Sequence, residues 1–455
     1  MHINPQQSLK TPKTNLMKKL SFLTTITFAL VATTLHAQTK VYITGSTAYR
    51  GATTTAIQNI YDSPPTFAFS NNSGTVGGAN QAIFQGNIGG VATQISTSWS
   101  GSEAGIQTVA DASQNVNFIA DGTVGSLSPG TSVATGTEAH HPDAAMSDTF
   151  QSTSQFNGTF NSVTYASLTE SPGTSAGHGS PVGVVPFKWC ASSNATFTNV
   201  TSQMIRALYG SGKLPLALFT GLSADEGVGV NKIVVAMGRN PDSGTRLTAF
   251  AESGVGALST VRQFQPQDSA AALVKTPTAT ITKFINWPAE TINGVPVASF
   301  NSGFASGGDL SKAMRAVTSD PVTVQIGAGT KSYAASDVIR VGYLGTGDAD
   351  PNLLSITGGQ GIPPALGIEL AYNGATLGNV NGNYNTVQAL LEGQYTFWGF
   401  EHLLYNNSTI NATVKTVADK LATRLHDNDA TVKLGSMRVT RVTDGSTVTN
   451  SYTTP

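Results

Sequence analysis

The chain has 455 residues, of which 39% are hydrophobic, 11% are charged and one is cysteine, and its formal net charge is -1. This length allows about two or three domains with a sizeable core. The near-zero charge argues against a nucleic-acid-binding surface, and the single cysteine, Cys190, excludes an intramolecular disulfide. The solvent-facing surface must therefore consist largely of Ser, Thr, Asn, Gln and Gly.

Residues 1–37 are predicted to be a secretion signal. Two lysines precede an apolar stretch over 20–35, and a small residue, Ala37, offers a cleavage site. The stretch contains threonines and is shorter than the ~20 apolar residues of a membrane span. Met17 is an alternative start of translation. We therefore expect a periplasmic or extracellular protein that is not an integral membrane protein, which the scarcity of cysteine also favours.

Strand-like apolar runs alternate with amphipathic patterns along the rest of the chain, which predicts a mixed α/β fold. The expected strands cover 40–44, 182–187, 232–237 and 338–344. The clearest helical pattern covers 411–427, where apolar residues recur on one face. These residues are Val414, Val417, Leu421 and Leu425.

The polar parts of the chain are expected to form turns and loops. Asp444–Gly445 predicts a two-residue hairpin turn within 437–449. Gly-rich polar segments at 70–81, 121–141 and 345–364 are expected to run over the surface.

Three short loops place glycine and hydroxyl residues directly before a helical pattern. They are Gly45–Ser46–Thr47, Gly101–Ser102 and Ser243–Gly244–Thr245. The first turn of a helix leaves backbone N–H groups unpaired, and the helix dipole adds partial positive charge there. Arg239, shortly before the third loop, would add a planar cation. The pattern predicts an anion site; the alternative is that the hydroxyls only cap their helices.

Asp148, in the segment 142–150, is a candidate acceptor in such a site. A carboxylate repels a fully ionised anion such as sulfate. It can, however, accept a hydrogen bond from an anion that keeps a proton, such as monohydrogen phosphate. The alternative is that Ser147 and Asp148 only cap a helix or turn.

Together these stretches resemble the periplasmic phosphate-binding proteins of ABC transporters, which have a type 2 periplasmic-binding fold. The matching stretches are 101-GSEAGI-106, 145-AMSD-148 and 239-RNPDSGT-245, in the family's order. The resemblance implies an α/β fold of two lobes, each a mixed sheet flanked by helices, here with long polar loop insertions. It implies that the phosphate ligands are Ser46, Thr47, Ser102, Asp148, Arg239, Ser243, Gly244 and Thr245.

Three stretches depart from the family's pattern, one of them the first loop, where Ala48 stands at the family's aromatic position and Tyr49 follows it. Pro241 stands where the family has an aspartate two residues after the arginine, and Asp242 follows it. Glu103 stands after Ser102 where the family has a small residue. A carboxylate pointing inward at that position would weaken anion binding.

The resemblance implies an exported, non-catalytic solute-binding protein that holds inorganic phosphate, or a similar tetrahedral oxyanion, in a cleft between the lobes. The expected organisation is a signal peptide over 1–37, lobe 1 over 38–180, lobe 2 over 181–338, and a return to lobe 1 with a C-terminal hairpin over 339–455. An ABC transporter permease is the expected membrane partner. No cofactor, metal ion or nucleic acid is expected.

Other functions remain open on the sequence. The low charge and the polar segments also suit a cell-surface or matrix adhesion protein that keeps the fold without binding an anion. His140, His141 and Asp143 form the densest group of metal-ligand residues, but their spacing matches no standard zinc site. Phosphatase activity has neither a metal cluster nor a nucleophile motif in its favour.

Overall fold

A computed structural model gives the structure of the chain. It describes residues 38–70, 74–126, 131–133, 136–171, 181–225, 232–354, 366–378 and 383–450. The predicted signal peptide lies outside the described residues, as do parts of the three predicted polar loops. Among the described residues, no helix has both the length and the apolar character that crossing a membrane requires.

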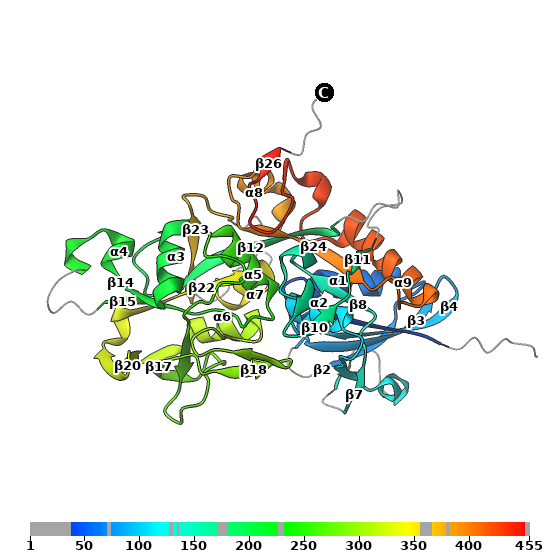
Figure 1. Ribbon diagram of the computed structural model, residues 1–455, viewed down its shortest axis with the longest axis horizontal. Coiled ribbons are helices and arrows are strands. Elements are labelled where there is room, and N and C mark those ends of the chain that lie inside the picture. Colours follow the sequence, from blue (N-terminus) through cyan, green and yellow to red (C-terminus); the bar gives the residue numbers. More distant parts are fainter. Residues whose placement is uncertain are drawn as a thin grey trace, which may run out of the picture. The chain divides into compact units, whose positions relative to one another are not determined.

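A mixed 14-stranded sheet runs through the described part of the chain (Figure 1). Its main path is β14 (Lys213–Pro215), β15 (Ile233–Ala236), β22 (Val338–Gly345), β12 (Gly183–Ser192), β24 (Trp398–Tyr405), β8 (Ala144–Ser147), β1 (Thr39–Gly45), β4 (Val91–Ser98), β3 (Gln81–Ile88), β2 (Thr66–Ser70) and β6 (Thr131–Val133). Beside this path lie β11 (Thr169–Glu170), β13 (Asn199–Val200) and β23 (Gly367–Tyr372). The strands β1, β12, β15 and β22 confirm the four that the sequence predicts.

Two long strands, β12 and β24, join the halves of this sheet. The first part of β12 pairs with β24, where Gly183 faces Glu401, and its second part pairs with β22. The later part of β24 pairs with β8, where His402 faces Ser147. One half therefore contains β15 and β22 and the other contains β8, β1 and β4, at the left and right of Figure 1. This is the two-lobe α/β arrangement that the sequence predicts.

Strand pairing bears on where the second lobe ends. The strand β22 lies between β15 and β12, and β23 also pairs with β12. The strands β22 and β23 thus share a half with β15, although the return to lobe 1 is predicted at residue 339. We propose that the chain returns through β24, because β24 pairs with both β12 and β8.

Helices pack against both halves of the sheet. Those beside β1 and β8 are α1 (Arg50–Ile60), α2 (Ser102–Ala110) and α9 (Ala412–Arg424). Those beside β15, β22 and β12 include α3 (Ser202–Ser211), α5 (Gly244–Glu252), α6 (Gly307–Arg315) and α7 (Thr346–Asn352). Two further helices, α4 (Ala217–Thr220) and α8 (Gln388–Leu391), are short.

A separate sheet consists of β16 (Phe264–Gln267), β17 (Thr280–Asn286), β20 (Val317–Ile326) and β21 (Gly329–Tyr333). Two-stranded pairs are β5 (Val116–Ile119) with β7 (Thr137–His140), β9 (Gly158–Phe160) with β10 (Val163–Tyr165), and β18 (Glu290–Ile292) with β19 (Val295–Val297).

The helix predicted over 411–427 is confirmed as α9. Asn411 caps it, because its side chain accepts a hydrogen bond from the N–H of Thr413. The helix packs against α1 and β1. The four residues predicted to share its apolar face are buried: Val414, Val417, Leu421 and Leu425.

The C-terminal strands β25 (Val439–Thr440) and β26 (Thr449–Asn450) pair, and the predicted turn at Asp444–Gly445 lies between them, because the N–H of Ser446 donates to the carbonyl of Thr443 at 3.1 Å. Residues 441–448 separate the two strands. Asp444 is buried and accepts a hydrogen bond from the N–H of Phe150 at 2.9 Å. Gly445 has a φ of 67°, and a Cβ there would overlap the backbone of Ala251. These long-range contacts and the local turn together fix the loop.

The segment 345–364, expected to be a surface loop, begins instead as helix α7. Asp348, Ala349 and Asp350 are buried in it. The ammonium group of Lys188, which is fully buried on β12, pairs with Asp350 at 2.8 Å. Lys188 neutralises the buried charge of Asp350. The polar segment of α7 can therefore pack inside the half that contains β22.

Candidate anion-binding site

Two glycines let the predicted loops approach one another. Gly45, at the end of β1, has a φ of 110°, and a Cβ there would overlap the carbonyl of Met146 in β8. Gly101, before α2, has a φ of 115°, and its N–H donates to the carbonyl of Gly45 at 2.9 Å. A Cβ on Gly101 would overlap the carbonyl of Asp242, in the loop before α5. The absence of side chains at these glycines therefore lets the starts of α2 and α5, from different halves of the sheet, lie against each other.

Asp148 binds hydroxyl groups from both halves. It follows β8 and is 1% exposed. The hydroxyl of Ser102, at the start of α2, donates to its Oδ1, and the hydroxyl of Thr245, at the start of α5, donates to its Oδ2 at 3.2 Å. A Cβ on Gly244 would overlap the same carboxyl. Burial raises the pKa of Asp148, while the hydrogen bond from Ser102 and the charge of Arg239 oppose this rise.

Arg239 lies close to this carboxyl and is 2% exposed. Its Nε donates to the carbonyl of Phe304 at 3.0 Å, and its Nη2 donates to the carbonyl of Ala305 at 2.8 Å. The Nη2 also donates to the hydroxyl of Thr47, just before α1, at 3.4 Å. Burial lowers the pKa of Arg239, and the nearby carboxyl of Asp348 opposes this change. Backbone carbonyls thus fix the guanidinium group in one half, and it reaches the other half at Thr47.

Of the predicted hydroxyl residues, Ser243 caps its helix and Ser102 does not. Ser243 caps α5, because its Oγ accepts a hydrogen bond from the N–H of Arg246 at 3.2 Å. Ser46 is buried, and its Oγ accepts the N–H of Tyr49 at 3.3 Å. The N-cap position of α2 is a glycine, so the Ser102 hydroxyl is not its cap and donates to the carboxyl described above.

All eight predicted ligands are buried: Ser46, Thr47, Ser102, Asp148, Arg239, Ser243, Gly244 and Thr245. Contacts join Ser102, Gly244 and Thr245 to Asp148, and Thr47 to Arg239. We call this group the cluster; Ser46 and Ser243 adjoin it in the chain. The cluster contains hydroxyl donors, one guanidinium group and one carboxyl at the starts of three helices. Such a set can bind a small oxyanion that also offers a proton to the carboxyl. The role of these residues as ligands stays a prediction.

The two acidic residues in the stretches that depart from the family's pattern, Glu103 and Asp242, have other hydrogen-bond partners. Glu103 is buried, and its oxygens accept hydrogen bonds from Thr149 at 2.9 Å and Ser154 at 2.6 Å. Burial raises the pKa of Glu103 to about 8. Asp242 accepts a hydrogen bond from the side chain of Asn293 at 2.8 Å, and burial raises its pKa to about 7. Neither carboxyl therefore needs the cluster for its hydrogen bonds.

Sequence reasoning missed two polar residues on β24 beside the cluster. Glu401 and His402 are fully buried within 398-WGFEHLLY-405, whose other residues are apolar or glycine. The ring of His402 lies 3.1 Å from Glu170 through its Nδ1. Burial, followed by the charge of Asp148, raises the pKa of Glu401 well above its usual range. The signal was present, because an acidic residue in an otherwise buried strand needs a partner or a function.

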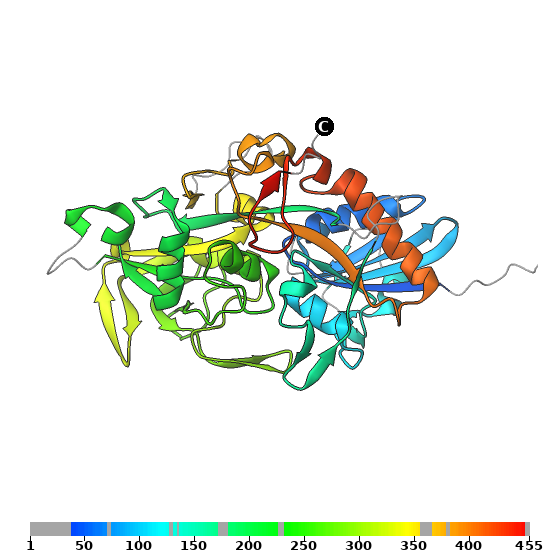
Figure 2. The ribbon, with the colours of Figure 1, turned by 45° about the horizontal axis from the view of Figure 1, so that its top comes forward.

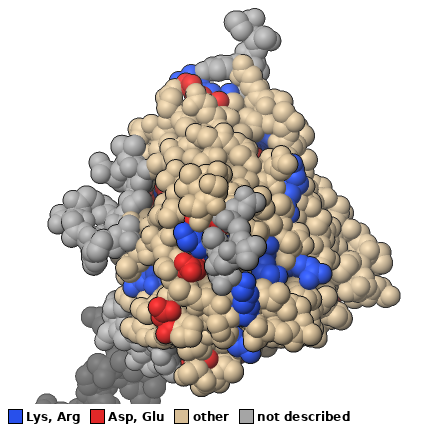
Figure 3. Space-filling view, turned by 90° about the vertical axis from the view of Figure 1, so that its left-hand side faces the viewer, with Lys and Arg blue, Asp and Glu red and all other residues tan. Residues whose placement is uncertain are grey.

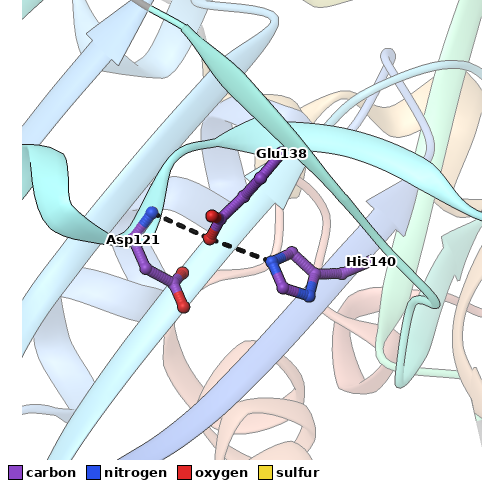
Figure 4. Close-up of side chains that lie close together, drawn as sticks. All are labelled: Asp121, Glu138 and His140. Carbon is purple, nitrogen blue, oxygen red and sulfur yellow. Dashed lines mark hydrogen bonds and ion pairs between the residues drawn. The ribbon is translucent and has the colours of Figure 1, made fainter.

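Among the described residues, His140 has its ligand atom close to those of Asp121 and Glu138, rather than to those of His141 and Asp143, with which the sequence groups it. Asp121, Glu138 and His140 have ligand atoms within 4.8 Å of one another (Figure 4). Glu138 accepts a hydrogen bond from the N–H of Asp121 at 2.9 Å and lies 2.9 Å from His140. The ammonium group of Lys40 donates to Asp121. These contacts occupy the atoms that a metal ion would use, and Lys40 would repel it.

A hollow of about 670 Å³ lies next to the cluster. Its lining includes Arg50 and Asn80 from one half and Ser306, Lys312 and Asp348 from the other. It adjoins the cluster because Ser306 follows Ala305, whose carbonyl accepts a hydrogen bond from Arg239. None of the eight predicted ligands lines this hollow.

Comparison with known proteins gives similar solved structures only. No protein-family model and no curated protein matches the chain. The similar structures include a Clostridium perfringens protein assigned as a phosphate ABC transporter substrate-binding protein and solved with bound phosphate (10% identity, 87% of this chain and 99% of that chain, TM-score 0.39). They also include an ABC-type phosphate transport receptor from Vibrio cholerae (11%, 85% and 96%, 0.35) and a phosphate-binding protein from Stenotrophomonas maltophilia (13%, 82% and 81%, 0.35). These proteins are of the family that the sequence motifs resemble, while the ligand of this chain is inferred below from its own side chains.

Proposed function

We propose that the chain is an exported solute-binding protein that binds inorganic phosphate, or a similar tetrahedral oxyanion, between its two lobes. The main support for this proposal is that the carboxyl of Asp148 accepts hydrogen bonds from two hydroxyls, those of Ser102 and Thr245. These two residues belong to opposite halves, and the buried Arg239 lies close by. An anion entering this cluster would meet a guanidinium group fixed by backbone carbonyls and hydroxyl groups that can turn toward it. The arginine would offer charge-assisted hydrogen bonds of roughly 1.5–3 kcal/mol each.

Asp148 makes the choice of anion specific. As a carboxylate it can accept a proton that the anion carries, which monohydrogen phosphate and arsenate retain at neutral pH. Sulfate has no proton to offer, so its oxygens would face those of Asp148 without a hydrogen bond. In the described state the hydroxyls of Ser102 and Thr245 donate to Asp148, and on binding they would turn toward the anion. This exchange couples anion binding to the approach of the two lobes.

Isothermal titration of residues 38–455 with phosphate, arsenate and sulfate tests the proposal. We expect phosphate and arsenate to bind and sulfate to bind much more weakly. Arg239→Ala should abolish binding. The matched control is Arg262→Ala, because Arg262 is exposed and its guanidinium stacks 4.6 Å from the ring of Phe300. An unmodified chain that releases no heat with millimolar phosphate would contradict the proposal.

Phosphate should also raise thermal stability. A ligand at about 100 times its dissociation constant stabilises the folded state by about 2.7 kcal/mol. We propose that no catalysis accompanies binding and that an ABC transporter permease receives the ligand. A chromogenic phosphate ester incubated with the chain should therefore remain intact.

The second candidate, a cell-surface or matrix adhesion protein, is favoured by the surface of the molecule. Figure 3 shows a face on which acidic and basic side chains are sparse. This accords with a chain of which 11% is charged. The titration separates the two, because an adhesion protein needs no intact anion site.

A further inference from the structure

A β-hairpin that belongs to one half of the molecule contacts the other half. Its strands are β18 and β19, and it begins in the half that contains β15, because Trp287 is buried in the same apolar core as Val235 and Met237. The N–H of Phe300 donates to the carbonyl of Trp287 at 2.7 Å, which closes the base of the hairpin. The chain thus leaves this half and returns to it, with the tip of the hairpin in between.

The tip is a tight turn at Asn293–Gly294, whose two residues have positive φ values of 47° and 81°. Asparagine and glycine adopt such conformations more readily than other residues. The carbonyl of Asn293 accepts a hydrogen bond at 3.1 Å from the side-chain amide of Gln107, which lies in α2 of the other half. The side-chain amide of Asn293 donates to the carboxyl of Asp242, in the loop before α5, at 2.8 Å. Asn293 therefore contacts two of the elements that carry predicted anion ligands.

Asp242 also contacts α2 directly, because its carbonyl accepts a hydrogen bond from the N–H of Glu103 at 3.0 Å. Glu103 and Gln107 lie four residues apart, so they are neighbours one turn apart on α2. The helix joins these two residues, and Asn293 joins Gln107 back to Asp242, so the contacts form a closed ring. The ring crosses between the halves twice.

An apolar contact of the hairpin supports these hydrogen bonds. Val295, the first residue of β19, packs against a buried apolar cluster that includes residues of α2, β10 and β24. The members of this cluster are Ile106, Ala110, Phe156, Tyr165 and Leu404. The polar and the apolar contacts of the hairpin thus both join it to the half that contains β8.

We propose that the β18–β19 hairpin is a latch of the anion site, and that Asn293 is its positioning residue, which holds α2 against the loop before α5 and so slows release of the anion. The inference rests on the proposed function. The predicted ligands Ser102 and Thr245, at the starts of α2 and α5, are buried, so a bound anion leaves when these two helix starts separate. Their separation breaks the ring at both crossings.

The test is the rate at which an excess of unlabelled phosphate replaces bound radiolabelled phosphate on the chain, measured by rapid filtration. Asn293→Gly removes the amide that binds Asp242 but keeps a residue that tolerates the positive φ. We expect release about fivefold faster than from the unmodified chain, as for the loss of about one hydrogen bond. The association rate should not fall, because every predicted ligand is still present. An unchanged release rate would overturn the inference.

The matched control is Asn373→Gly. Asn373 also has a positive φ, 52°, and a glycine with a φ of 88° follows it. Its side chain accepts a hydrogen bond at 3.0 Å from the N–H of Ser202, which opens α3 in the same half. Because this contact stays within one half, the release rate should equal that of the unmodified chain. Equal acceleration by the two variants would trace the effect to the loss of an asparagine turn and would overturn the inference.

A variant on the other side of the ring tests whether the contacts act together. Gln107→Ala removes the amide that donates to the carbonyl of Asn293, so it should also release phosphate about fivefold faster. Because both variants open the same ring, their combination should release phosphate more slowly than the product of the two separate effects predicts. Effects that multiply would contradict the ring.

A measurement without phosphate separates this inference from the proposed function. Thr55→Cys in α1 and Ser332→Cys in β21 place spin labels at exposed positions of opposite halves, while the native Cys190 is buried. Asn293→Gly should shift the distances between the labels to larger values in double electron–electron resonance. Unchanged distances would overturn the inference, even in a chain that binds phosphate. Larger distances in a chain that binds no phosphate would contradict the proposed function and the role in release, while confirming that the hairpin joins the halves.

Discussion

Arg50 and Asp348 form an ion pair between the two halves of the molecule, with 3.3 Å between Nη2 and Oδ1. Arg50 opens α1 in one half, and Asp348 lies in α7 in the other. A Cβ on Gly307 would overlap the carboxyl of Asp348, which therefore lies against the start of α6. The side chains of the pair are 13% and 7% exposed. Asp348 thus links Arg50 to the positive end of a helix across the hollow beside the anion cluster.

Replacing Asp348 should weaken the closed arrangement of the lobes. Asp348→Ala leaves Arg50 with a hydrogen bond to Asn80 only, so we expect the free energy of unfolding to fall by about 1–3 kcal/mol. Small-angle scattering should show a larger radius of gyration. The control is Lys415→Ala, which removes a half-buried pair within one helix and should cost about 0.5 kcal/mol. Equal losses for the two variants would contradict a special role of Asp348.

Gly244→Ala should disrupt the anion cluster. The added Cβ would overlap the carboxyl of Asp148 and lie 2.7 Å from the Cβ of Ser102. We expect a loss of about 1–3 kcal/mol in urea unfolding and no measurable phosphate binding. Gly435→Ala is the matched control, because nothing lies within 4 Å of a Cβ there. Normal phosphate affinity in Gly244→Ala would show that the helix start and the carboxyl do not meet as described.

The buried carboxyl of Glu103 predicts a pH dependence of stability. Its pKa is about 8 in the folded chain against 4.5 ordinarily, because burial disfavours the charged form. The folded state therefore binds the proton more tightly, and this contribution to stability is lost as the pH rises from about 4.5 to about 8. Urea unfolding across this range should show falling stability. Glu103→Gln should flatten the curve, and an unchanged slope would contradict the assignment.

The C-terminal segment should stabilise the region where β24 crosses between the halves. Figure 2 shows this segment in red over the centre of the ribbon. Arg441 pairs with Glu252 of α5 at 3.0 Å and lies 4.0 Å from the ring of Trp398. Arg441→Ala leaves Glu252 without its cation, so we expect a loss of about 3–5 kcal/mol in urea unfolding.

A matched variant checks that this loss comes from burial. Arg424 forms a comparable pair with Asp429, but its side chain is 35% exposed where that of Arg441 is fully buried. Arg424→Ala should therefore cost about 1 kcal/mol or less. A loss as large as that of Arg441→Ala would mean that burial does not set the strength of the C-terminal pair.

Short-range patterns were sufficient for much of the fold and for finding the loops of the candidate site. The strands β1, β12, β15 and β22 follow from apolar runs, and α9 follows from the spacing of its apolar residues together with Asn411. The loops before α1, α2 and α5 could be found because glycine and hydroxyl residues at a helix start form a local signal. That these loops meet was expected from the resemblance, and the contact of Thr245 with Asp148 agrees with it.

Tertiary structure decided what depends on residues far apart in the chain. Asp444–Gly445 forms the turn that its composition predicts, but contacts with Phe150 and Ala251 decide where that turn lies. The polar stretch of α7 is buried because Lys188, on a distant strand, compensates Asp350. Glu401 comes level with Asp148 only through the register of β24 on β8. Helix periods and caps are set within a few residues, whereas strand register and the pairing of buried charges arise only when distant segments pack together.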